Sequence, residues 1–152
     1  MNDALDTFVG QLQEEIFEDT RKTFGETAFR RWKTPLYMGS MDAPDGYAKA
    51  KGKCGNMEIF LRFGKERAEK ALFRTDGCGS DLICGSFAAE MAVGKTADEI
   101  LRVSGKDLLE RMGGLPKENE PAAFHAAKTL HLAAKAYKET LMPRSSGNET
   151  RG

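Results

Sequence analysis

Residues 47–75 read YAKAKGKCGNMEIFLRFGKERAEKALFRT, and this stretch decides the fold. It divides into three runs typical of β-strands, Tyr47–Lys53, Met57–Phe63 and Glu69–Thr75. Two short polar segments that contain glycine separate the runs, and these lengths favour consecutive antiparallel strands. Charged residues alternate with apolar ones along the runs, so we expect one face of the sheet to contact water.

Helical patterns surround this meander. Residues 3–24 place apolar side chains three and four positions apart, which is typical of an amphipathic helix. Residues 30–44 contain several helix breakers, two prolines and a glycine, and are expected to be irregular. Four further helices are predicted: Ser80–Val93, a short one that begins near Thr96, Ser104–Met112 and Asn119–Leu141.

The order of these elements predicts one α+β domain. It consists of an N-terminal helix, a three-stranded antiparallel sheet, and C-terminal helices packed on one face of the sheet. With 152 residues, of which 40% are hydrophobic, the chain can bury a single core. We expect the domain to span residues 1–142 and residues 143–152 to form a disordered tail.

Charge and hydropathy exclude several classes of partner and location. Lys+Arg and Asp+Glu both number 23, so no excess positive charge is available to attract nucleic acid or an anionic membrane. No apolar run approaches the length of a membrane span, and Asp3 and Asp6 in the first helix are unlike a secretory signal. Three cysteines do not form a disulfide framework, so we expect a cytoplasmic protein with reduced thiols.

The predicted meander brings two cysteines together. Cys54 lies in the turn between the first two strands, and Cys78 follows the third strand, which returns to the same end of the sheet. Glycines flank both cysteines, so a bulky inorganic group can approach the backbone closely. The helix that begins after Cys78 favours a thiolate at its N-terminus, although Asp81 opposes this effect. From geometry alone, the pair is either a metal or thiol site or two cysteines in tight turns.

Five motifs occur in order along the chain. They are Asp-Ala-Pro-Asp-Gly (42–46), Gly-Lys-Cys-Gly-Asn (52–56), Thr-Asp-Gly-Cys-Gly-Ser (75–80), Gly-Lys-Thr-Ala-Asp-Glu (94–99) and Leu115-Pro116. With the long final helix, they resemble the NifU/IscU-type iron–sulfur cluster assembly scaffolds, which have a SufE/NifU-like fold. The resemblance implies a cytoplasmic scaffold that is not an enzyme. Such a scaffold receives sulfur from a cysteine desulfurase, builds a transient [2Fe–2S] or [4Fe–4S] cluster and passes it to apo-acceptor proteins.

The resemblance also implies a site of three cysteines and one aspartate, and this chain keeps only part of it. Cys54 and Cys78 match the first two cysteines, and Asn56 stands where the family has the aspartate. The family's His-Cys pair falls on Pro121 and Ala122, so the third cysteine is absent. Alanine cannot bind iron, and a neutral amide is a poorer ligand than a carboxylate. Cys54 and Cys78 therefore remain the main candidates, with Asn56 as a weaker one.

Two other side chains are candidates to complete the site for iron or for zinc. His125 lies three residues after Ala122 on the same helix face, and its imidazole is directed toward the vacated position. The alternative is that His125 is only a partly buried helix histidine. Cys84, on the second turn of the helix after Cys78, is either a ligand or a thiol packed in the core. A third arrangement uses Cys54 and Cys78 from both chains of a homodimer.

Two functions compete with the cluster scaffold. A scaffold-like binding module would dock a cysteine desulfurase and regulate it without holding a cluster. A dithiol enzyme would cycle a Cys54–Cys78 disulfide, but the sequence predicts no general base near the pair, so we rank this function last.

Overall fold

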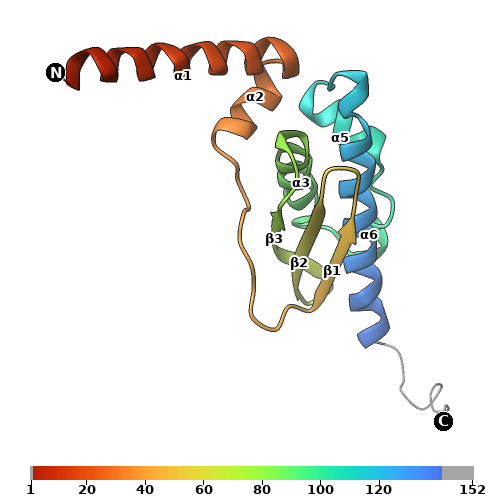
Figure 1. The fold of residues 1–152 in the computed structure, drawn as a ribbon. Coiled ribbons are helices and arrows are strands. Elements are labelled where there is room, and N and C mark those ends of the chain that lie inside the picture. The colour runs from red at the N-terminus through yellow and green to blue at the C-terminus, as the bar shows by residue number, and fades with distance from the viewer. Residues whose placement is uncertain (1, 142–152) are drawn as a thin grey trace.

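The computed structural model describes residues 2–141 (Figure 1). Two helices, α1 (Asn2–Phe24) and α2 (Glu26–Lys33), precede three strands, β1 (Gly46–Lys51), β2 (Asn56–Gly64) and β3 (Arg67–Thr75). The chain continues through α3 (Gly79–Ala92), α4 (Ala97–Ile100), α5 (Gly105–Met112), the 3-10 helix η1 (Lys117–Asn119) and α6 (Pro121–Thr140). The predicted α+β fold class is confirmed. The predicted tail, residues 143–152, lies outside the described residues.

The three strands form one antiparallel sheet in the order β1-β2-β3. In the central strand, Ile59 pairs with Ala48 of β1 and Phe73 of β3, and all three side chains are buried. The opposite face carries the ion pair between Glu58 and Arg74, at 2.8 Å. The charge alternation therefore predicted correctly which face of the sheet contacts water.

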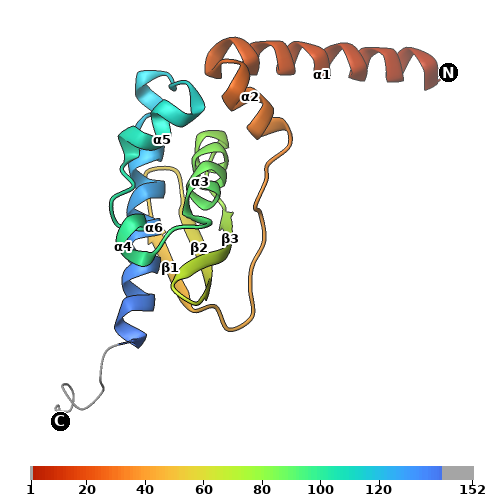
Figure 2. The ribbon, with the colours of Figure 1, turned by 180° about the vertical axis from the view of Figure 1, so that it is seen from behind.

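Helices α3 and α6 pack against the sheet and against each other (Figures 1 and 2). Glycines allow these elements to approach closely, because a Cβ atom would collide with the neighbouring element. Gly85 of α3 lies against the ring of Phe73, and Gly46 of β1 lies against the backbone carbonyl of Ala133 in α6. The N-terminal parts of α3 and α6 lie beside the β1–β2 turn.

The N-terminal region contains a second helix, α2, that the sequence did not predict. Gly25 has a positive φ of 88° and redirects the chain from α1 into α2. The prediction of irregular structure from residue 30 onward is wrong for residues 30–33, which complete α2. The rings of Phe29 and Trp32 each pack edge-on against Phe17 of α1, with centroids 6.1 Å apart. This contact between two helices stabilises a last turn that the local sequence pattern did not indicate.

Most of α1 extends away from the sheet (Figures 1 and 2). Its apolar side chains Phe8, Val9 and Leu12 are exposed. The spacing of these residues predicted the helix correctly. The three side chains are nevertheless not buried against the rest of the described chain. None of the helices in residues 2–141 is both long and apolar enough to cross a membrane.

Candidate metal centre

Cys54 and Cys78 meet at one end of the sheet, with their Sγ atoms 2.8 Å apart. Cys54 lies in the turn between β1 and β2, and Cys78 is the N-cap residue of α3. Two hydrogen bonds hold the turn against the end of β3: the Asn56 amide donates to Oδ1 of Asp76 at 2.7 Å, and the Asp76 amide donates to the Asn56 carbonyl at 3.2 Å. The predicted convergence of the two cysteines is confirmed.

The two thiols are exposed and not joined by a disulfide, and they differ in acidity. Burial raises the pKa of Cys78, but hydrogen bonds to Cys54, to the Ser80 hydroxyl at 3.1 Å and to backbone amides of α3 outweigh it, so the pKa is lowered overall. The hydrogen bond to Cys78, together with burial, raises the pKa of Cys54. Cys78, at the N-terminus of a helix, is therefore the more acidic thiol of the pair.

Asp81 adds a carboxylate to the cysteine pair, and sequence reasoning did not identify it as a ligand. One of its oxygens and the Sγ atoms of Cys54 and Cys78 all lie within 4.8 Å of one another. The Asp81 side chain is only 3% exposed, and burial raises its pKa. Its spacing of three residues from Cys78, at the start of a helix, was the signal that could have placed it on the same side.

A cavity of about 60 Å³ lies beside this group. It is bounded by the β1–β2 turn, the first turn of α3 and the beginning of α6, and its lining residues are Lys53, Cys54, Ser80, Asp81, Glu118, Asn119, Pro121, Ala122 and His125. Ala122 is buried in this wall. The position where the family resemblance places a third cysteine therefore does face the site, but it offers no ligand atom.

His125 enters the same cavity from α6, and its side chain is 8% exposed. Its Nε2 lies 3.0 Å from the carbonyl oxygen of Ala50. A carbonyl can only accept a hydrogen bond, so in the neutral imidazole Nε2 carries the proton and Nδ1 carries a lone pair. Nδ1 lies 3.7 Å from Oδ1 of Asp81. Neither Nδ1 of His125 nor Oδ2 of Asp81 has a hydrogen-bond partner in the described part of the chain.

The other two candidate ligands lie elsewhere. Asn56 lines a separate hollow with Glu58 and Arg74. Cys84 is fully buried in the hydrophobic core, where burial raises the pKa of its thiol. Neither residue is among those that line the cavity beside Cys54. These positions favour core packing for Cys84 and give no support to Asn56 as a ligand.

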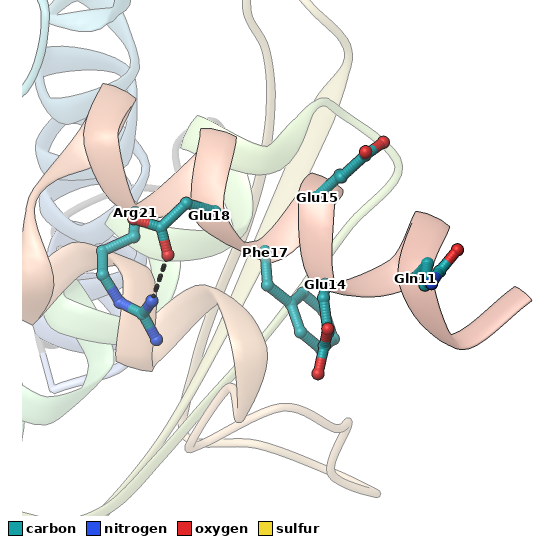
Figure 3. Close-up of a pocket in the computed structure, with 6 residues that line it drawn as sticks. All are labelled: Gln11, Glu14, Glu15, Phe17, Glu18 and Arg21. Carbon is teal, nitrogen blue, oxygen red and sulfur yellow. Dashed lines mark hydrogen bonds and ion pairs between the residues drawn. The ribbon is translucent and has the colours of Figure 1, made fainter. Parts of the chain in front are cut away.

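A larger hollow of about 770 Å³ lies along α1 (Figure 3). Its lining residues are Gln11, Glu14, Glu15, Phe17, Glu18 and Arg21. Figure 3 shows Arg21 paired with Glu18, with the nitrogen and oxygen 2.9 Å apart. These six side chains include neither a thiol nor an imidazole, so none of the sequence-predicted candidate ligands lies in this hollow.

Comparison with known proteins gives consistent matches. The family model described as the NifU-like N terminal domain matches residues 23–142. The chain is 31% identical over 116 residues to the iron-sulfur cluster assembly scaffold protein IscU 1 of Archaeoglobus fulgidus, covering 75% of this chain and 76% of that protein. It is 30% identical over 122 residues to the iron-sulfur cluster assembly scaffold protein IscU of Aquifex aeolicus, covering 75% of each.

One solved structure with a similar fold is that of the N-terminal part of a nitrogen-fixing NifU-like protein from Brucella abortus. The TM-score is 0.62 at 15% sequence identity, and the match covers 78% of this chain and 96% of that one. At this identity the likeness concerns the fold alone.

Proposed function

The chain belongs to the family of NifU-like N-terminal domains, and from this premise we propose that it is an iron–sulfur cluster assembly scaffold. Its cargo is iron and sulfide, held at Cys54 and Cys78 as a transient [2Fe–2S] or [4Fe–4S] cluster and then passed to acceptor proteins. Residues 1–142 form the domain that does this. The proposed role is binding and delivery, without a catalytic step.

The observation that carries the proposal is the 2.8 Å separation of two exposed thiols. Thiolates are the usual protein ligands of iron–sulfur clusters. A pair at the surface can receive and release its cargo without unfolding of the domain. The names of the relatives at about 30% identity support the same function.

We expect two kinds of protein partner. A cysteine desulfurase supplies the sulfur, and apo-proteins that need a cluster receive the product. The cytoplasm is the compartment that suits this role, because its reducing conditions keep Cys54 and Cys78 as thiols rather than as a disulfide.

Anaerobic reconstitution of the full chain with ferrous iron, sulfide and a thiol reductant tests the proposal. We expect iron and acid-labile sulfide to remain with the chain through gel filtration, and Cys54→Ser and Cys78→Ser each to lose both. Cys84→Ala removes a thiol that is packed in the core and is the matched control. It should retain iron and sulfide. Retention that is unaffected by Cys54→Ser would contradict the proposed site.

Ala122 favours a second candidate function. It occupies the cavity wall where the family resemblance places a third cysteine. A module that docks and regulates a cysteine desulfurase does not need a complete set of metal ligands. This candidate predicts that the chain binds the desulfurase in a pull-down assay, while the reconstituted chain retains neither iron nor sulfide.

A further inference from the structure

Two buried polar atoms of residues that line the cavity have no hydrogen-bond partner in residues 2–141. They are Oδ2 of Asp81 and Nδ1 of His125, whose side chains are 3% and 8% exposed. A buried polar group normally finds a hydrogen bond or binds an ion, because leaving it unpaired is costly. Two such atoms at one cavity, beside two thiols, therefore point to a ligand that contacts all of them.

The hydrogen bond from His125 to Ala50 determines which ring nitrogen can bind that ligand. Because Nε2 donates to the Ala50 carbonyl, the Nδ1 lone pair of the neutral ring is directed toward the Asp81 carboxylate, 3.7 Å away. A lone pair and a carboxylate repel each other unless a proton or a cation lies between them. Two cysteine sulfurs, a carboxylate and an imidazole are donors that zinc and iron accept, so a divalent cation is the ligand that fits.

We propose that Asp81 and Nδ1 of His125, together with Cys54 and Cys78, form a four-ligand site for one divalent zinc or iron ion within a single chain. This inference rests on the proposed function, from which it takes the two cysteine ligands. It adds a carboxylate and an imidazole that replace the ligands this chain has lost at Asn56 and Ala122.

The distances suit three of the four ligands directly, because one Asp81 oxygen and the Sγ atoms of Cys54 and Cys78 lie within 4.8 Å of one another. His125 lies outside that group, so its ring must approach the sulfur atoms when the ion binds. Tetrahedral zinc with sulfur at about 2.3 Å and nitrogen or oxygen at about 2.0 Å requires neighbouring ligand atoms about 3.3–3.8 Å apart. The Asp81–His125 separation of 3.7 Å already meets this requirement. The two Sγ atoms, at 2.8 Å, must move apart to admit the ion. Cys54 lies in an exposed turn and can make this movement without disturbing the core.

The neighbouring chain segments hold the two added ligands in place. Gly77 leaves room for Oδ2 of Asp81, and Gly52 leaves room for the ring of His125, because a Cβ at either position would collide with the side chain named. The cavity is also reached by Lys53, whose ammonium group can balance the charge of two thiolates and a carboxylate around a divalent ion.

Cobalt binding to the metal-free full chain tests the inference. Co²⁺ takes the coordination of zinc, and its absorption spectrum reports both sulfur ligation and tetrahedral geometry. Trp32, the chain's single tryptophan, lies against Gly79 next to Cys78, so its fluorescence gives a second readout. We expect one Co²⁺ per chain, bound by monomers on gel filtration.

Asp81→Asn and His125→Gln should each weaken Co²⁺ binding by more than about 100-fold. Loss of a residue that only orients a metal ligand weakens binding by up to about 100-fold, so a larger loss indicates direct ligation. Asp98→Asn, in the first turn of α4, and His131→Gln, later on α6, are the matched controls and should bind like the natural chain. Circular dichroism of each metal-free variant checks that its fold is intact.

X-ray absorption of the zinc-loaded natural chain tests the inference even if a variant fails to fold. Two sulfur and two nitrogen or oxygen neighbours per zinc are expected, whereas four sulfur neighbours would mean that two chains share the ion and would overturn the inference. Folded Asp81→Asn and His125→Gln variants that bind Co²⁺ normally would also overturn it. If Cys54→Ser still abolishes binding in that case, the proposed function survives. Binding that persists in Cys54→Ser would contradict the proposed function itself.

Discussion

Gly52 lies directly against the imidazole of His125, so closely that a Cβ atom at position 52 would collide with the ring. The two residues are far apart in the sequence, one in the turn that carries Cys54 and the other on α6. The contact determines how near the turn comes to α6. It also holds the ring where Nε2 reaches the Ala50 carbonyl at 3.0 Å. Gly52 is therefore required by the packing of the site.

Gly52→Ala should displace His125 and destabilise the fold by about 1–3 kcal/mol, because the added methyl group overpacks a buried ring. Thermal unfolding of the metal-free protein measures this effect. Gly10→Ala is the control, since Gly10 is an exposed residue within α1 with nothing near its Cβ position. There we expect a stabilisation of up to about 1 kcal/mol. Equal unfolding temperatures for the natural chain and Gly52→Ala would show that the turn can move away from α6.

Ala122→Cys should raise the amount of iron and sulfide retained after anaerobic reconstitution, because it places a thiol in the wall of the cavity beside Cys54. Asn56→Asp is the matched control. It restores the second missing family ligand at a residue that lines a different hollow, so we expect little gain from it alone. A larger gain from Asn56→Asp than from Ala122→Cys would mean that the turn rearranges when metal binds.

Alkylation of the native, reduced protein should modify Cys54 and Cys78 and leave Cys84 free. The first two thiols are exposed, whereas Cys84 is fully buried and burial raises its pKa, so it offers neither access nor a thiolate. Mass spectrometry of the alkylated protein should show two modifications, and a third only after addition of denaturant. Rapid modification of Cys84 without denaturant would contradict its core position and reopen its candidacy as a ligand.

Glu90 should make the stability of the fold depend on pH. It accepts hydrogen bonds from Arg31 of α2 at 2.7 Å and from Arg111 of α5 at 2.8 Å, and so joins both helices to α3. Burial raises the pKa of Glu90, but the two guanidinium groups outweigh burial and lower the pKa overall. The stabilisation is therefore present above the unfolded-state value of about 4.3 and is lost as pH falls through the lower folded-state pKa.

Glu90→Gln should thus cost about 2 kcal/mol at pH 7, the usual range for hydrogen bonds to a charged group. The difference from the natural chain should disappear in strong acid, where both side chains are neutral. Thermal unfolding at several pH values measures this. Glu110→Gln, at an exposed position on α5, is the control and should change stability by less than about 0.5 kcal/mol. A Glu90→Gln penalty that is the same at all pH values would point to altered packing instead of lost charge.

The sheet and the cysteine pair could be predicted because they depend on local patterns. Strand length, glycine-containing turns and the reversal of direction in a meander bring Cys54 and Cys78 to the same end of the sheet, whatever the helices do. Helix α2 could not be predicted in this way. It is stabilised by the packing of Phe29 and Trp32 on Phe17 of α1, and that contact depends on the angle between two helices.

Of the two side chains that lie beside the cysteine pair, the sequence predicted one. The sequence indicated His125 as a residue directed toward the vacated position, since residues three apart share a helix face. Asp81 was interpreted only as a charge that opposes thiolate formation at Cys78. Its burial against His125 depends on how α6 packs on α3, and no local spacing reveals that packing.

By itself, the sequence determined the order of the strands and of the helices other than α2 and η1, the convergence of Cys54 and Cys78, and the absence of a ligand at Ala122. Only the tertiary structure decided which polar atoms are buried without a partner. Whether Nδ1 of His125 has a hydrogen-bond partner depends on three residues around the ring, Ala50, Gly52 and Asp81. They belong to β1, to the turn that follows it and to α3. The physical reason is that hydrogen bonding and burial are properties of the packed molecule, in which residues distant in sequence exclude water together.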